Sequence, residues 1–381
     1  MPRLRERQAE CEQLGQLPNS TQQELVEAGF YRILQPRRFG GFEFDLPTFF
    51  EIMATVASGC PSTGWVLALT AGHAHTLAAL FPEETQVEVF GRDGEYRAPL
   101  SGNGSATIAP VDDGYRLSGG WSYVSGCTTA THFIGMSRMP DADSRFFALI
   151  DRDAFQVVPD RDVMGMVGTG SHRIVVEDVF VPARRVIGQP MDEAGSRNAP
   201  GRRVHANPLY AAGRVGSVLF GEMAAVAVGM ASGALEVFEA ELRSKRMNYP
   251  PFTPRGEVPE YQRHFGEAWA LVSMASATLK RIGADYMSFC EQDASEGVPF
   301  SDQLDGQLRL LEQYVTKLAA DAIDIMFRSA GTSAARDASP LQRYFRDMAI
   351  VRTHFAAQYE RGAEEFGRAY FGGTAQGPWA H

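Results

Sequence analysis

The chain has 381 residues, of which 44% are hydrophobic and 22% are charged, and its formal net charge is -10. This length is sufficient for two or three packed units, and the composition is ordinary for a globular protein. The acidic balance argues against nucleic acid or an anionic membrane as the main partner.

The first residues, MPRLRERQAE, have no apolar stretch behind their charges, and no run of 18 uncharged apolar residues occurs anywhere in the sequence. We therefore expect neither a signal peptide nor a membrane span, and a cytoplasmic location. The four cysteines are far apart and lack CxxC or CxxH spacing. This spacing predicts no disulfide framework and no metal site.

Residues 1–97 are predicted to form an N-terminal helical domain. The stretch TQQELVEAGFYRIL has a helical apolar pattern and is followed by Pro36 and the pair Gly40 and Gly41. Two further stretches, LPTFFEIMATVASG and STGWVLALTAGHAHTLAALF, are apolar almost continuously. Such helices are expected to be buried on more than one side.

Residues 98–205 change to short β-branched or aromatic runs divided by Gly, Asp and Pro, among them GYRLSGGWSYVSG, HFIGMSR, RFFALID and HRIVVEDVFVP. This pattern predicts an antiparallel β domain, a barrel or a sandwich.

Residues 206–381 return to the helical period in four long stretches, at 221–246, 261–290, 307–331 and 343–362. Four successive long helices predict an up-and-down bundle. The last stretch, RYFRDMAIVRTHFAAQYERG, is expected to be one helix with His354 in its middle. The fold class is therefore α+β, in the order helices, antiparallel β domain, four-helix bundle.

This order resembles the acyl-CoA dehydrogenase fold, and five local stretches are similar to its two-component flavin-dependent monooxygenase branch. That branch includes the oxygenase components of 4-hydroxyphenylacetate hydroxylase, a steroid-ring hydroxylase and dibenzothiophene monooxygenase. The stretches are LVEAGFYRILQPRRFGGFEFDLPTF, STGWVLALTAGH, LSGGWSYVSGCTTATHF, MVGTGSHRIVVEDVFVPARRV and LQRYFRDMAIVRTH. They span nearly the whole chain.

The resemblance implies that Trp121, Val124 and Ser125 lie against a flavin. A hydroxyl at Ser125 would reach the flavin N5 and O4, where the reduced flavin adds oxygen to give a C4a-hydroperoxide, and a donor there would retain the peroxide. The alternative is that Ser125 and Gly126 simply form a turn, since Ser-Gly is a common turn pair.

His354 is the second catalytic candidate. In the acyl-CoA dehydrogenases a glutamate base follows an arginine on this helix by nine residues, and the ninth residue after Arg346 here is Phe355. The resemblance implies that His354, one residue earlier, acts as a base toward a phenol or orients the hydroperoxide. Imidazole suits proton transfer near neutral pH. The alternative is a histidine that only caps or packs.

His73 is a third, weaker catalytic candidate, because the branch often has a histidine near the substrate at this place. It could hydrogen-bond a substrate oxygen, or it could be a polar residue at the end of a buried helix. His75, two positions further along, would point about 200° away on the same helix.

Three residues are candidates for contacts to the flavin chain and its phosphate. Ser171 lies in the glycine-rich segment GTGSHRIVVEDV, Ser333 lies in AGTSAARD where some relatives have an arginine, and Arg243 ends the first bundle helix. A terminal arginine is also a common solvated charge that favours the helix dipole. GTG lacks the context of a dinucleotide fingerprint, so no NAD(P)H site is expected in this chain.

The resemblance implies an oxygenase component that hydroxylates a small aromatic, phenol-like or indole-like substrate with FMNH2 or FADH2 and O2. A separate NAD(P)H-dependent reductase would supply the reduced flavin, and the chain would form a homotetramer. Two alternatives remain open: a flavin dehydrogenase acting on acyl thioesters, disfavoured by Phe355, and a flavin monooxygenase that oxidises nitrogen or sulfur.

Overall fold

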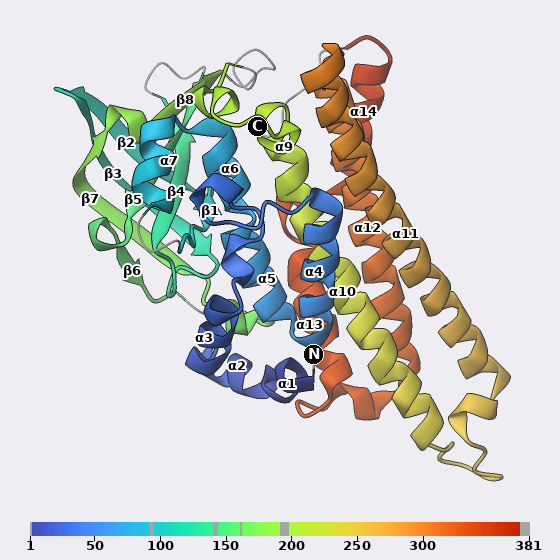
Figure 1. The fold of residues 1–381 in the computed structure, drawn as a ribbon. Helices are drawn as coiled ribbons and strands as arrows, with labels where there is room; N and C mark the ends of the chain where they lie inside the picture. Colours follow the sequence, from blue (N-terminus) through green and yellow to red (C-terminus); the bar gives the residue numbers. More distant parts are fainter. Residues whose placement is uncertain (1, 92–94, 140–143, 161, 191–197, 374–381) are drawn as a thin grey trace.

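The structure is a computed structural model that describes residues 2–91, 95–139, 144–160, 162–190 and 198–373. Helices form both ends of the described chain, and strands form its middle. Figure 1 shows the strands at one side, the long C-terminal helices at the other, and α4 to α6 between them.

The N-terminal part is helical, as expected. Asp45 starts α4 by accepting a hydrogen bond from the backbone N–H of Thr48, and Pro47 follows in the first turn, which is a favourable helix start. Nearly every residue of α5 is buried, in agreement with its continuous apolar sequence. The helices are α1 (Pro2–Glu6), α2 (Gln8–Leu14), α3 (Asn19–Glu27), α4 (Leu46–Gly59), α5 (Pro61–Ala71), α6 (His73–Leu80) and α7 (Glu83–Phe90).

The strands form two four-stranded sheets, in the orders β1-β4-β5-β8 and β2-β3-β7-β6. All pairings are antiparallel except that of the short β1 with β4, which is parallel. A separate apolar core of inward-facing side chains fills the space between the sheets. The strands are β1 (Leu100–Ser101), β2 (Gly104–Val111), β3 (Gly114–Val124), β4 (His132–Arg138), β5 (Ser144–Asp151), β6 (Gln156–Val158), β7 (His172–Pro182) and β8 (Val186–Pro190).

The C-terminal helices pack around the long α10, which is buried over most of its first five turns. Of the described helices, α10 alone is long and apolar enough to cross a bilayer, and 89% of its most apolar window is buried by the protein itself. The helices are α9 (Pro208–Ala211), α10 (Val215–Ser244), α11 (Pro259–Glu296), α12 (Asp302–Ser329), α13 (Pro340–Val351) and α14 (Tyr359–Tyr370).

The prediction of one helix over residues 343–362 is wrong. α13 ends at Val351, a short 3-10 turn spans Phe355–Ala357, and α14 starts at Tyr359. His354 has extended backbone angles (φ -69°, ψ 143°), and its Nδ1 accepts a hydrogen bond from the backbone N–H of Ala356 at 3.3 Å. The histidine therefore interrupts the helix by capping the turn that follows it.

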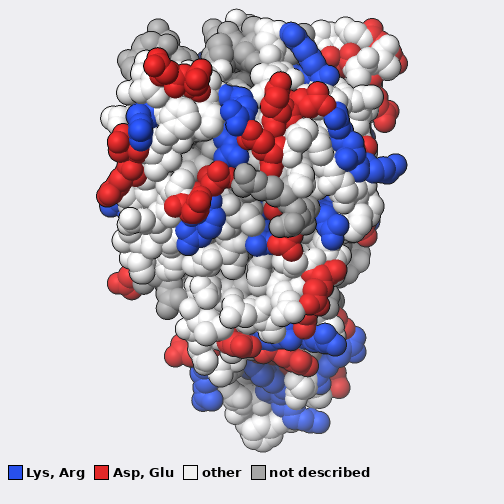
Figure 2. Space-filling model, turned by 60° about the vertical axis from the view of Figure 1, so that its left-hand side comes forward, with Lys and Arg blue, Asp and Glu red and all other residues white. Residues whose placement is uncertain are grey.

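Charged side chains of both signs interleave over the face of the molecule shown in Figure 2. Many are paired along helices at a spacing of four residues, such as Arg263 with Glu267 and Arg281 with Asp285. Such ion pairs neutralise one another, so they add nothing to the net negative charge of the chain.

Candidate active site

The end of β3 holds Ser125 in a tight turn. Tyr123 has a left-handed backbone (φ 56°), and the pairing of β3 with β7 shifts register between Trp121 and Val124. Gly126 is also left-handed (φ 75°), and its N–H donates to the backbone oxygen of Thr169 at 2.8 Å. The turn expected for Ser125 and Gly126 is present, and it joins the end of β3 to the segment before β7.

Three hydrogen bonds between side chains and one to a backbone oxygen connect the residues around Ser125. The indole Nε1–H of Trp65 in α5 donates to Ser125 Oγ at 3.0 Å. Ser125 Oγ lies 2.7 Å from Ser171 Oγ, which lies 2.6 Å from Thr169 Oγ1. The Thr169 hydroxyl in turn donates to the backbone oxygen of Met166 at 2.7 Å. We call the hydroxyls of Ser125, Ser171 and Thr169 the hydroxyl chain.

The proton positions in the hydroxyl chain follow from its two ends. A carbonyl oxygen only accepts, so the single proton of Thr169 points to Met166, and Ser171 must donate to Thr169. Ser125 must then donate to Ser171, because the proton of Ser171 is already used. The donor role expected for Ser125 does not match this pattern, since its remaining capacity is that of an acceptor.

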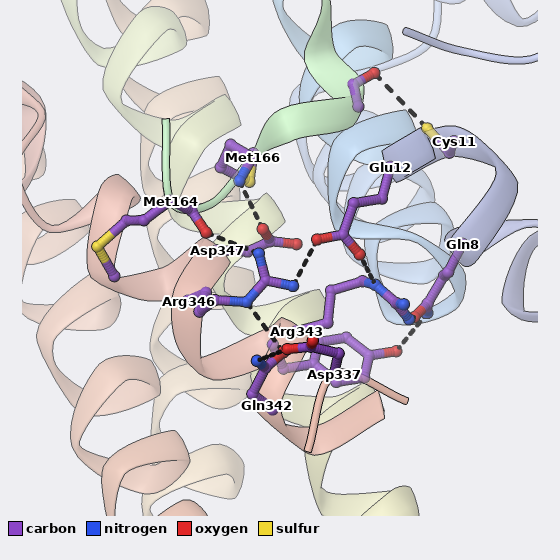
Figure 3. A network of polar contacts seen from close by, with 12 residues as sticks. Gln8, Cys11, Glu12, Met164, Met166, Asp337, Gln342, Arg343, Arg346 and Asp347 are labelled. Atoms are coloured by element: carbon purple, nitrogen blue, oxygen red, sulfur yellow. Dashed lines mark hydrogen bonds and ion pairs between the residues drawn. The ribbon is translucent and has the colours of Figure 1, made fainter. Parts of the chain in front are cut away.

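A carboxylate anchors the far end of the hydroxyl chain. The backbone N–H of Met166 donates to Asp347 Oδ1 of α13 at 2.5 Å, and Arg346 donates to the backbone oxygen of Met164 at 2.6 Å (Figure 3). Asp347 is buried, and burial raises its pKa to about 6. A Cβ on Gly165 would lie 2.4 Å from the backbone oxygen of Arg346, so the loop lies directly against α13.

The same network reaches the N-terminal helices. Glu12 of α2 pairs with Arg343 at 2.7 Å and also contacts Arg346 (Figure 3). The two arginines lower the pKa of Glu12 against the effect of its partial burial. Three segments far apart in sequence, α2, the loop after residue 162 and α13, are thereby fixed to one another.

His354 also contacts Trp65. The two rings contact edge to face with centroids 5.8 Å apart, and Phe355 packs beside His354 at 4.6 Å. Ser125 and His354, predicted as the catalytic pair, therefore share Trp65 as a common neighbour.

Burial lowers the pKa of His354 to about 4, so the imidazole is neutral near pH 7. Because Nδ1 accepts from Ala356, the proton of the neutral ring is on Nε2. In this arrangement His354 offers a hydrogen-bond donor, and its lone pair is occupied.

His73 is placed at the start of α6, fully buried, and both its ring nitrogens are engaged. Nδ1 lies 2.7 Å from the backbone oxygen of Ala98, and Nε2 lies 3.4 Å from Glu222 Oε1. Glu222 is fully buried, and burial raises the pKa of this carboxyl although the contact with His73 opposes the shift. His75 points elsewhere, with Nε2 at 2.9 Å from the backbone oxygen of Leu209.

Four predicted cofactor residues are not brought into this cluster by their side chains. Trp121 is fully buried between the sheets, where its indole donates to Met136 at 2.9 Å, and Val124 packs in the same core. Arg243 is exposed at the end of α10 and pairs with Glu239. Ser333 is exposed in a short turn after α12. Their assignment to the cofactor stays a prediction.

Sequence reasoning missed Tyr123, Thr169 and Asp347. The Tyr123 ring is 67% exposed, beside the buried Val124 and Ser125. Alternation along β3 indicates a side chain directed away from the sheet core, but the left-handed backbone at Tyr123 has no sequence signal. Thr169 lies within the stretch GTGS, and the clue available in the sequence was its two hydroxyl side chains next to glycines.

The residues fit a flavin. The exposed ring of Tyr123 provides a flat apolar surface, and the hydroxyl of Ser125 follows two residues later. An isoalloxazine ring needs such a surface together with hydrogen-bonding groups at its edge.

The chain also has a pocket between the start of α12 and α14, next to the His354 turn. Phe220 and Phe355 contact each other there at 5.5 Å, and Phe355 is 44% exposed. Gln313 lines the same pocket, and its Oε1 has no hydrogen-bond partner among the described residues. No group of three or more His, Cys, Asp or Glu suited to a metal occurs in the described parts of the chain.

Comparison with known proteins supports the same chemistry. The family described as acyl-CoA dehydrogenase, C-terminal domain, matches residues 222–359. The oxygenase subunit HsaA of a flavin-dependent monooxygenase from Rhodococcus jostii (strain RHA1) is 33% identical over 98% of this chain and 96% of its own length. The oxygenase component of an FADH2-dependent resorcinol hydroxylase from Rhizobium sp. (strain MTP-10005) is 29% identical over 97% of this chain and 91% of its own length.

A solved structure agrees over the whole chain. The crystal structure of 3-HSA hydroxylase from Rhodococcus sp. RHA1 has a TM-score of 0.89 and 30% identity, and it covers 99% of this chain and 96% of the solved one. The likeness therefore extends through the helices at both ends and the sheets between them.

Proposed function

Because the chain belongs to the oxygenase subunits of the flavin-dependent monooxygenases, with an acyl-CoA dehydrogenase-like fold, we propose that it hydroxylates a small aromatic substrate bearing a hydroxyl or ring N–H. The observation that supports this assignment is that Ser125 and His354 both contact the side chain of Trp65. Reduced flavin, when bound, supplies the electrons that activate O2.

Three residues of this chain have separate proposed roles in binding and in oxygen transfer. The exposed ring of Tyr123 carries the flavin ring, and Ser125 accepts a hydrogen bond at its edge. His354 directs its Nε2–H toward the oxygen that is transferred, because its Nδ1 is held by Ala356. A fixed donor in a site shielded from water stabilises developing negative charge better than water does.

The second proposed role for His354 is that of a general base that accepts a proton from the substrate. It requires the imidazole to release Ala356 and turn its lone pair to a substrate hydroxyl. The contact between His354 Nδ1 and the Ala356 N–H is 3.3 Å, which is long for a hydrogen bond, so breaking it costs little free energy. Substitution of His354 separates the role of donor from the role of base. His354→Gln keeps an N–H donor but cannot accept a proton, whereas His354→Ala can do neither.

The two other activities are less well supported by the site. An acyl-thioester dehydrogenase needs a carboxylate base, and the residue beside His354 is the half-exposed Phe355. Oxidation of nitrogen or sulfur could use the same donor, and ring hydroxylation is preferred because the relative named as a resorcinol hydroxylase acts on a phenol. The pocket beside Phe220 and Phe355 is suited to the part of the substrate remote from the oxidised carbon.

We further propose the partners of this enzyme. An oxygenase subunit receives reduced flavin from a separate NAD(P)H-dependent reductase. The enzyme is proposed to be a cytoplasmic homotetramer. Association of subunits is supported by the exposed apolar side chains Trp269 and Met274 on α11, which packing between bundles would cover.

The experiment is a single turnover. Protein preloaded anaerobically with FMNH2 or FADH2 is mixed with O2 and a panel of phenols and indoles, and hydroxylated product and H2O2 are both measured. Product on at least one phenol or indole is expected. Reduced flavin that is oxidised entirely to H2O2 with every compound would contradict the proposal.

A further inference from the structure

We propose that Cys11 and Cys60 are a site of oxidation by hydrogen peroxide, at which Cys60 reacts first and Cys11 then closes a disulfide bond with it. Both side chains are buried, and neither is in a disulfide bond in this structure. The two cysteines lie far apart in the sequence, so only the fold brings them together.

The pair results from the packing of α2 against the junction of α4 and α5. Gln8 and Cys11 are the buried residues of α2, and they lie one turn apart on the same face. Gln8 Nε2 donates to the backbone oxygen of Gly59 at 2.6 Å, directly before Cys60. Cys11 therefore meets Cys60, and the two thiols hydrogen-bond each other.

Gly168 holds Cys11 in this position from another side. Cys11 Sγ lies 3.6 Å from the backbone oxygen of Gly168 and donates to it. A Cβ on Gly168 would lie 2.4 Å from Cys11 Sγ and 3.1 Å from Ser62 Cβ, so α2, the start of α5 and the segment before β7 meet at this thiol. The hydrogen bond is one that a disulfide bond can replace.

Cys60 is placed to react first. It is the N-cap residue of the eleven-residue α5, and the partial positive charge at a helix N-terminus favours a thiolate. Contacts with Cys11 and with Thr63 lower the pKa of Cys60, although burial opposes this shift. The pKa of Cys11, by contrast, is raised by Cys60 and by burial.

A small polar pocket reaches Cys60. Its lining includes Cys60, Gln8, Glu12, Arg343 and Asp347, and the last four lie close together in Figure 3. These side chains offer both hydrogen-bond donors and acceptors, which suits hydrogen peroxide, a small molecule that donates and accepts. The positive charge of Arg343 also favours hydroxide as the leaving group.

The reaction balances with hydrogen peroxide as the oxidant. The thiolate of Cys60 attacks a peroxide oxygen, the O–O bond breaks, and the hydroxide that leaves takes up the proton of the former thiol as water. The thiol of Cys11 then attacks the sulfur of the resulting sulfenic acid. The S–S bond forms, the S–O bond breaks and a second water leaves, so two thiols lose two electrons to one peroxide.

The proposed activity provides a source of this oxidant, because reduced flavin that reacts with O2 without oxygen transfer yields hydrogen peroxide. The inference goes beyond that function and does not depend on it, since the pair reacts with peroxide from any source.

The other two cysteines are expected to stay reduced. Cys127 donates to the backbone oxygen of Gly170 at 3.3 Å, and burial raises its pKa to about 11. Cys290 is fully buried in α11, and burial raises its pKa as well. Buried thiols that stay protonated are inert.

The test treats the full-length, reduced protein with hydrogen peroxide in the absence of flavin. Catalase then removes the peroxide, the chain is unfolded in an alkylating reagent, and its peptides are mapped by mass without reduction. Wild type is expected to keep two of its four free thiols and to show the peptide of Cys11 joined to that of Cys60. A thiol reductant should restore all four.

Three variants test the order of the two steps. Cys11→Ala should stop at the sulfenic acid of Cys60, which dimedone traps. Cys60→Ala should leave Cys11 unmodified. Cys290→Ala is the matched control, and it should still form the joined peptides.

Four free thiols in wild type after peroxide treatment would overturn the inference, as would a disulfide bond that includes Cys127 or Cys290. Both results are read from wild type, so they do not depend on the folding of a variant. A sulfenic acid on Cys11 in Cys60→Ala would refute the order of the steps. Because neither flavin nor substrate is present, failure here is distinct from failure of the proposed function.

Discussion

The half-buried imidazole at position 354 gives a quantitative prediction about stability and pH. In the folded protein the pKa of His354 is lowered to about 4 by burial, whereas in the unfolded chain it returns to about 6.5. The imidazole of His354 therefore binds a proton below about pH 6.5 in the unfolded chain, but only below about pH 4 in the folded protein. The stability that depends on a neutral His354 is fully present above about pH 6.5, and it is lost as the pH falls from there to about pH 4.

The size of this loss follows from the pKa difference. At about 1.4 kcal/mol per pH unit, protonation of His354 in the unfolded chain lowers the free energy of unfolding by about 3 kcal/mol at pH 4. About 2 kcal/mol of this is already lost at pH 5. The other histidines contribute to wild type and variant alike, so they cancel in the comparison.

The assay is denaturant unfolding at pH 7.5 and pH 5 for wild type, His354→Gln and Phe355→Leu. The wild type and Phe355→Leu should each lose about 2 kcal/mol more than His354→Gln between these two pH values. Phe355→Leu changes the neighbouring ring but keeps the imidazole, so it controls for disturbance of the turn. Equal pH dependence of wild type and His354→Gln would refute the presence of a neutral imidazole with a lowered pKa at this position.

Three other substitutions have defined outcomes. Ser125→Ala leaves the indole of Trp65 without an acceptor, and it should cost about 1–3 kcal/mol of unfolding free energy and raise H2O2 yield in turnover; unchanged stability and yield would count against it. Gly165→Ala places a Cβ 2.4 Å from the backbone oxygen of Arg346, and it should lower the unfolding free energy by about 1–3 kcal/mol in the same denaturant assay, whereas a neutral effect would show that the loop is not fixed to α13. Tyr123→Leu removes an exposed ring and should weaken anaerobic binding of reduced flavin about tenfold without loss of stability, and unaltered binding would exclude this ring as a platform.

Much of the fold follows from local sequence patterns. The stretches HFIGMSR and HRIVVEDVFVP coincide with β4 and β7, because β-branched and aromatic residues bounded by turns have few alternatives. The helices α10, α11 and α12 were likewise expected from their apolar periodicity. The break after Val351 was not expected, because a capping histidine and a helical histidine look alike in a sequence.

The candidate site was less predictable than the fold, because its contacts join segments that are far apart in the sequence. Ser125 and His354 were found as single residues, but their common neighbour Trp65 follows only from the packing of α5 against two distant segments. The direction of the hydroxyl chain depends on Met166 O, which no side-chain pattern encodes. Arg243 was selected for its charge, and it lies in an ion pair on the exposed end of α10.

The most direct measurement is the rate of hydroxylation, followed together with the product formed per reduced flavin oxidised, in single turnovers of wild type, His354→Gln and His354→Ala with one phenol that the wild type hydroxylates. If His354 acts through its Nε2–H, His354→Ala should lose about 100-fold or more of the hydroxylation rate, while His354→Gln should retain a substantial part of it. Full product from His354→Ala would remove the imidazole from the chemistry, and equal losses in both variants would contradict its role as a donor.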